Sequence, residues 1–203
     1  MDVRQLTPDL WYWKAPHPKW REWPVDARDG RAWPERVGCV YFEAPEAVCL
    51  IDPLLPQGEE ESFLRHLDSD VERLRRPLVI LLTAGWHRRS ADELARRYDA
   101  RIDPDRLPPG IAEIPIRGAD ERQVAYFIEG PRALVVAEIF AVDSSGTLAV
   151  YPSPALTRPD ELRASLEQIE ALPVERLLVS HGEPILTHAR HAVSRAIAEA
   201  QLS

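Results

Sequence analysis

Residues 77–98, PLVILLTAGWHRRSADELARRY, contain a strand, a short loop and the start of a helix in direct succession. The run 77–83 is almost continuously apolar, which is typical of a central strand covered on both faces. Ser90 is a plausible cap for the helix that follows. The loop between strand and helix carries His87 and two arginines. A polar loop at the carboxyl end of a buried strand is a common place for an active site.

A matching unit lies in the second half of the chain. The apolar run 176–180 leads directly into His181 and Gly182, and a final helix follows from about Thr187. Each unit is preceded by hairpin-like β segments and a helix. The repetition predicts an α/β fold in which two related layers pack sheet against sheet, with both histidine loops at the carboxyl ends of strands.

Periodicity predicts the remaining elements. Alternating or apolar runs predict strands, and apolar positions spaced three and four residues apart predict amphipathic helices. The helix at 157–172 is expected to be capped at its start, with Thr157 before Pro159. The predicted strands are LWYW (10–13), VGCVYFEA (37–44), AVCLID (47–52), EIPI (113–116), QVAYFIE (123–129), ALVVAEI (133–139) and TLAVYP (147–152), and the further helix is 59–76.

Composition limits the class of protein. The 203 residues, 45% hydrophobic and 29% charged, suit one globular domain over 1–203. A net charge of −8 and a pI near 5.3 argue against binding to nucleic acid or to an anionic membrane. No apolar run approaches the roughly 20 residues that span a bilayer. The N-terminus lacks a signal-peptide pattern, so we expect a cytoplasmic protein with Cys39 and Cys49 reduced.

The segment at about 14–36 is rich in tryptophan and proline, which is typical of a long loop. Its indoles could form a lid or an interface, including one between two copies of the chain, since tryptophan is common at interfaces. They could equally cover the edge of the core. The tryptophans in and just before this segment are Trp11, Trp13, Trp20, Trp23 and Trp33.

Several of these segments together resemble the metallo-β-lactamase-fold hydrolase superfamily over nearly the whole chain. The resemblance implies a four-layer αβ/βα sandwich and, in the usual family member, hydrolysis by metal-activated hydroxide. It rests on the loop quoted above, VCLIDPLLP (48–56), VAYFIEG (124–130), ALVVAEIF (133–140) and LLVSHGEPI (177–185).

The resemblance carries over only part of the family's metal site. His181 matches the last histidine ligand, and Glu138 stands where the bridging aspartate is expected. Asp52 matches a supporting position behind the ligands. At 118–119 the family's glycine–histidine pair reads Gly-Ala, so one ligand is missing.

In the family, the loop after the matching strand reads His-x-His-x-Asp-His and supplies metal ligands. This motif can be aligned with the present chain in two ways. Counting forward from Thr83 loses every ligand of the loop. Counting backward from the helix places His87 on the motif's final histidine and Trp86 on its aspartate. We prefer the second alignment because the helix is the firmer anchor.

These residues leave two functional interpretations open. The preferred one is a small-molecule-binding or interaction protein with a degenerate metal site and no cofactor, in which Arg88 or Arg89 pairs with Glu138 or binds an anionic ligand. Those arginines could also simply be solvated. The alternative is a hydrolase of an ester, thioester or amide with one zinc or iron ion on His87, Glu138 and His181. There, His181 could also act as general base, and Ser180 is the only serine that we would test as a nucleophile.

Overall fold

The computed structural model describes residues 3–20, 34–119, 121–143, 145–151 and 156–200. Its main feature is a pair of β-sheets. The first has the order β1-β2-β3-β4-β5-β6 and the second the order β12-β9-β8-β7. The bounds are β1 Val3–Thr7, β2 Leu10–Pro16, β3 Arg36–Ala44, β4 Ala47–Ile51, β5 Leu78–Leu81, β6 Arg101–Ile102, β7 Ile111–Ile116, β8 Gln123–Ile128, β9 Ala133–Val136 and β12 Arg176–Val179.

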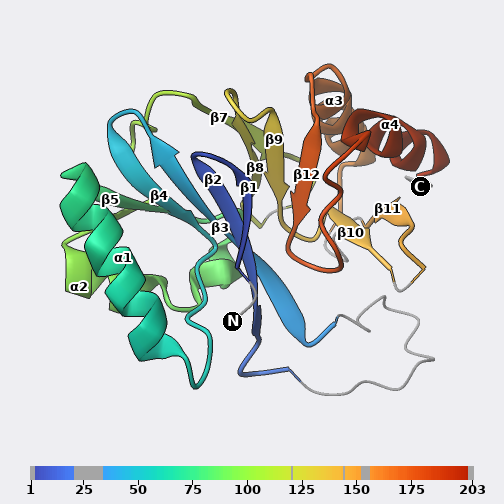
Figure 1. Ribbon diagram of the computed structural model, residues 1–203. Helices are drawn as coiled ribbons and strands as arrows, with labels where there is room; N and C mark the ends of the chain where they lie inside the picture. Colours follow the sequence, from blue (N-terminus) through green and yellow to red (C-terminus); the bar gives the residue numbers. More distant parts are fainter. Residues whose placement is uncertain (1–2, 21–33, 120, 144, 152–155, 201–203) are drawn as a thin grey trace.

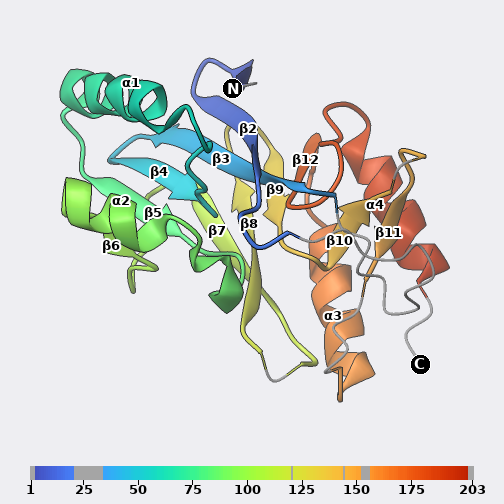
Figure 2. The same cartoon turned by 90° about the horizontal axis from the view of Figure 1, so that it is seen from below.

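Helices cover the outer face of each sheet. Figure 2 shows α1 and α2 on one side of the two sheets and α3 and α4 on the other, so the layers run αβ/βα. A short hairpin, β10–β11, lies beside α4 (Figure 1). This arrangement confirms the predicted four-layer sandwich. The bounds are α1 Glu60–Leu74, α2 Ala91–Tyr98, α3 Pro159–Glu170, α4 Ala189–Glu199, the 3₁₀ turn η1 Gly85–Arg88, β10 Phe140–Val142 and β11 Leu148–Val150.

Three apolar clusters fill the spaces between these layers. The middle cluster joins the facing sides of the two sheets, where Tyr12 and Phe42 meet Tyr126 and Leu178. The outer clusters lie beneath α1 and α2 and beneath α3 and α4. Alternation along each strand separates these clusters, because successive side chains point to opposite faces. The near-continuous apolar run in β5 follows from its cover on both faces.

Local details differ from the sequence-based expectations. The sequence patterns do not predict β1, β6 or β10. Ser90 does hold the N-cap position of α2, but its hydroxyl accepts a hydrogen bond from the Leu55 backbone N–H at 3.0 Å instead of capping the helix. Arg158, and not Thr157, holds the N-cap position of α3. At Ser90 the difference arises because a tertiary contact competes with the local capping bond.

The tryptophan-rich segment, expected from about residue 14, begins after Pro16, because the predicted strand at 10–13 continues to that residue as β2. Trp11 and Trp13 belong to β2, and the buried Trp13 donates its indole N–H to the Leu54 carbonyl at 3.0 Å. Trp20 is exposed, while Trp23 and Trp33 lie outside the described residues. A role in dimer formation stays a prediction.

Cys39 and Cys49 are both free thiols in the core. Burial raises the pKa of the Cys39 thiol to about 11 and that of Cys49 to about 12. Their side chains belong to clusters on opposite faces of the first sheet, so they do not face one another. Within the described residues, no helix has the length and apolar character that a membrane crossing needs.

Gly38 marks a point where the two sheets approach closely. Its N–H donates to the Ser180 carbonyl at 2.8 Å, and a β-bridge joins its neighbour Val37 to His181. A Cβ at position 38 would lie 2.3 Å from the Val179 carbonyl oxygen and 2.4 Å from the Tyr12 hydroxyl. Only glycine allows this contact between the halves without a shift of backbone atoms.

We therefore expect Gly38→Ala to lower the free energy of unfolding by about 2–3 kcal/mol, as overpacking of a rigid contact does. The matched control is Gly130→Ala, because a Cβ there meets nothing within 4 Å. Denaturant unfolding of both variants measures the difference. Equal stability of the two variants would show that the sheets can separate at no cost.

Candidate functional site

The candidate site lies where strands of both sheets end. Asp52 directly follows β4, Thr83 follows β5 by two residues, and His87 is in η1. From the other sheet, Glu138 follows β9 by two residues and Ser180–His181 directly follows β12. The parallel pairs β4–β5 and β9–β12 bring these ends to one edge. The structure thus brings together the three side chains predicted as ligands.

His87 is the centre of the site. Its ring is buried, with 3% of the residue exposed. The Nδ1 atom lies 2.8 Å from Asp52 Oδ2, and the Nε2 atom lies 2.8 Å from Glu138 Oε1. Thr83 completes the Asp52 end, since both its backbone N–H and its hydroxyl donate to that carboxylate. The two ring nitrogens are therefore each held by a carboxylate.

Glu138 links His87 to the second sheet. Its Oε1 atom also lies 3.3 Å from His181 Nε2, and its Oε2 atom accepts the Trp86 indole N–H at 3.2 Å. Trp86 packs edge-on against the His87 ring and is 46% exposed. The side chains of Asp52, His87, Glu138 and His181 form a hydrogen-bonded series in space. We call this series the polar chain. It runs from the core of the first sheet to the surface, where Glu138 and Trp86 reach solvent.

The environment sets the protonation of the polar chain. Burial lowers the pKa of His87, but the Asp52 and Glu138 charges outweigh it and raise that pKa to about 9. Burial alone would raise the pKa values of Asp52 and Glu138, yet the His87 charge and their hydrogen bonds hold both below the usual range. At neutral pH His87 is thus an imidazolium between two carboxylates.

His181 has the opposite character. Burial lowers the pKa of its imidazole and outweighs the opposing effect of Glu138. At neutral pH His181 is therefore neutral and donates through Nε2 to Glu138. The polar chain thus contains one charged and one neutral imidazole.

Arg88 and Arg89 both bind groups other than Glu138, so the predicted ion pair with that carboxylate is wrong. Arg88 is exposed and forks onto Asp92, one helical turn later, at 2.6–2.9 Å. Arg89 points inward and binds oxygens other than carboxylates. His87, in contrast, has polar partners on both sides, because Asp52 and Glu138 contact its two ring nitrogens.

Sequence reasoning missed two residues near the polar chain. In the sequence Thr83 is only an anchor for alignment, although its hydroxyl donates to Asp52 and lies 3.0 Å from His87 Nδ1. The sequence pattern indicates a surface position for His17. Burial lowers the pKa of His17 most, and the neighbouring Arg89, His181 and His87 lower it further, so His17 lies within electrostatic range of the site. Its position directly after β2, whose partner β3 bridges to His181, is the signal that could have indicated this.

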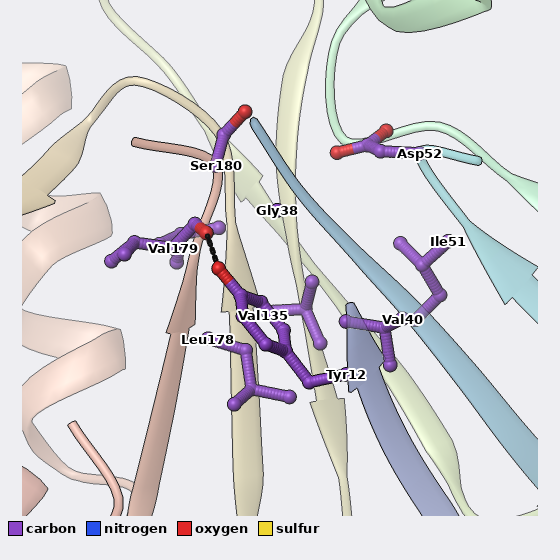
Figure 3. A pocket seen from close by; sticks show the side chains of 10 residues that line it. Tyr12, Gly38, Val40, Ile51, Asp52, Val135, Leu178, Val179 and Ser180 are labelled. Carbon is purple, nitrogen blue, oxygen red and sulfur yellow. Dashed lines mark hydrogen bonds between the residues drawn. The ribbon is translucent and has the colours of Figure 1, made fainter. Parts of the chain in front are cut away.

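Below the polar chain the two sheets enclose a narrow crevice. Figure 3 shows Asp52 and Ser180 at its mouth and Tyr12 rising between the sheets toward the Val179 carbonyl. The Tyr12 hydroxyl donates to that carbonyl at 3.2 Å. The crevice has no room for a water molecule. A ligand therefore has to approach the polar chain from the surface.

Comparison with known proteins adds to this picture. No family model and no curated protein matches the sequence. Solved structures do match: a metallo-β-lactamase from Pontibacter korlensis aligns with 98% of this chain and 99% of its own, at 10% identity and a TM-score of 0.54. The chain has the metallo-β-lactamase fold.

Two further structures agree. A metallo-β-lactamase family protein from Thermus thermophilus covers 96% of this chain and 80% of its own, with 16% identity and a TM-score of 0.53. VMB-1 aligns with 98% of this chain and 98% of its own, with 9% identity and a TM-score of 0.59. At these identities the metallo-β-lactamase fold is what the comparisons establish, and activity has to be argued from the site.

The donor set suits at most one metal ion. Two ligands that each lie about 2.0–2.1 Å from a tetrahedral zinc are roughly 3.3 Å apart. The distance of 3.3 Å between Glu138 Oε1 and His181 Nε2 matches this spacing. The distance of 2.8 Å between Glu138 Oε1 and His87 Nε2 is that of a hydrogen bond. Asp52 holds His87 Nδ1 as a carboxylate behind a metal-bound histidine would. Within the described ranges, no group of three or more His, Cys, Asp or Glu side chains has the spacing of a metal cluster. A pair of metals would lack ligands, since Gly118 and Ala119 provide none.

Proposed function

We propose that this protein is a small-molecule-binding or interaction protein in which the polar chain takes the place of a dinuclear metal centre. The observation that supports this most is that both ring nitrogens of His87 are hydrogen-bonded. Its two ring nitrogens bind two carboxylates, and the raised pKa places a proton where a metal ion would otherwise bind. A buried carboxylate needs a cationic partner, and here the imidazolium supplies it.

The surface near the fold's usual ligand edge supports the binding role. An open hollow of about 380 Å³ lies between β7–β8 and the start of α3. This is within the size of small-molecule sites. Gly118 and Ala119, where the family would place a histidine, are in its wall. The charged side chains around it have both signs, which suits a polar or zwitterionic molecule: Glu113, Arg117, Glu121, Arg122, Arg158 and Glu161.

Metal analysis tests the proposal directly. Protein purified without chelator and without nickel resin should contain less than roughly a tenth of an equivalent of zinc or iron, whereas a tight structural or catalytic site would fill. Hydrolysis of p-nitrophenyl acetate should be the same for the wild type and His181→Ala. Close to one equivalent of metal, lost in His181→Ala, would overturn the proposal.

That outcome would favour a second candidate function, hydrolysis of an ester, thioester or amide with one metal ion. The convergence of His87, Glu138 and His181 on one another is what favours it. A bound zinc ion would supply a hydroxide at neutral pH. The protein's own contributions would be Asp52, which orients His87, and the Trp86 indole, which fixes Glu138.

A further inference from the structure

Arg89 is the second cation of the site, and its position is unusual. Its Nη1 atom donates to the carbonyls of Gly38 at 3.0 Å and Asp52 at 2.9 Å, and its Nη2 atom donates to the Ser180 hydroxyl at 2.7 Å. One guanidinium thus connects β3, the end of β4 and the end of β12. The contacts join both sheets immediately beside Asp52 and His181.

The backbone at Arg89 is adapted to this position. Its φ of 35° is in the left-handed region, which a side chain other than glycine rarely adopts. Such a conformation persists when surrounding contacts determine it, and it is found most often at functional sites. The adjacent Arg88 does not share this conformation and turns outward to Asp92.

The site already contains a permanent cation, because a guanidinium is always charged in proteins. Arg89 holds this charge beside the converging donors, since it binds the Asp52 carbonyl and the hydroxyl of Ser180, the residue directly before His181. Its field therefore reaches the atoms that a metal would contact. A dication added there would meet a fixed like charge, which is costly in a partly buried site.

We infer that Arg89 is the residue that determines the cation preference of this site, because its fixed guanidinium disfavours a divalent metal ion on the three converging donors. The inference rests on the proposed function, in which the site works without a metal ion. It gives the reason why these donors need no metal. It goes beyond that function because it assigns the selectivity to one side chain that is not itself a candidate ligand.

The test is calorimetric titration of zinc chloride into chelator-treated protein at pH 7. The neutral variants Arg89→Gln and Arg89→Met should bind zinc at least about tenfold more tightly than the wild type, which corresponds to about 1.4 kcal/mol. Arg89→Lys keeps the charge but cannot bridge three acceptors, so its zinc affinity should stay within about threefold of the wild type. Ser180→Ala removes one contact of Arg89 and keeps the guanidinium. Its zinc affinity should therefore also stay within about threefold of the wild type.

The outcomes separate this inference from the proposed function. Tight zinc binding by the wild type itself contradicts the proposed function, whereas the ratio of neutral variant to wild type tests Arg89 in either case. Neutral variants that bind zinc no better than the wild type would overturn the inference, and so would Arg89→Lys binding as tightly as Arg89→Gln. Failure of both neutral variants to fold would also overturn it, in favour of a purely structural role.

Discussion

His87→Ala should lower the free energy of unfolding by about 4 kcal/mol at pH 7. The substitution removes the cation between Asp52 and Glu138 and leaves two carboxylates without their partner in a largely buried site. Breaking a buried charge pair from one side costs about 3–5 kcal/mol, since the remaining charge has lost both water and partner. Denaturant unfolding followed by circular dichroism measures the loss.

The matched control for this change is His191→Ala. His191 is exposed on α4, so its replacement should alter stability by less than about 0.5 kcal/mol. The double variant His87→Ala with Glu138→Ala adds a second comparison. Because it removes one of the stranded carboxylates, it should be more stable than the sum of the single losses by about 1–3 kcal/mol. A loss below about 1 kcal/mol in His87→Ala would contradict an imidazolium bound by two carboxylates.

The stability of the wild type should fall as the pH rises from 6.5 to 9. His87 has a pKa of about 9 in the folded protein and an ordinary value of 6.5 in the unfolded chain. The folded state therefore binds the proton more tightly, and this stabilisation is complete below pH 6.5. It decreases as the pH rises and is lost above the folded pKa. The difference between the two pKa values corresponds to about 3 kcal/mol.

The acid side of the profile has the opposite slope. The pKa values of Asp52, Glu138 and His181 are all lowered in the folded state. Each group therefore contributes less to stability as the pH falls below the pKa that the group has in the unfolded chain. For His181 this loss begins near pH 6.5. A stability maximum near pH 6.5 follows.

Unfolding of chelator-treated protein at several pH values measures this profile. In His87→Ala the decline between pH 6.5 and 9 should be absent, because the group that releases the proton is gone. A wild-type curve that stays flat or rises over this range would show that His87 is neutral in the folded protein.

Much of the fold can be predicted from local patterns. Several patterns depend only on residues that are close together in the sequence. They are the apolar run of β5, the helical periodicity of α1 and α3 and the hairpin of β3 and β4. The strand–histidine–helix units of the two halves likewise indicate where the loops emerge. Strand β1 escapes prediction because it is a mostly exposed edge strand, with little apolar alternation to reveal it.

The candidate site is only partly predictable. The sequence places His87, Glu138 and His181 at strand ends, and the parallel strands bring such ends to one edge. It does not select the partners of the charged side chains. Arg88 and Arg89 are adjacent, both follow the same histidine, and dipole considerations apply to both equally.

Local patterns along the chain are therefore sufficient for the layers, the strand ends and the set of polar residues available at the edge. Packing of the two halves is needed before His87 can bind Asp52 and Glu138, which are 35 and 51 residues away along the chain, and before Arg89 turns inward while Arg88 turns outward. The difference arises because periodicity reports which face of an element is buried. Partner choice depends on distances of about 3 Å between loops of different sheets, and these exist only after the two halves have packed.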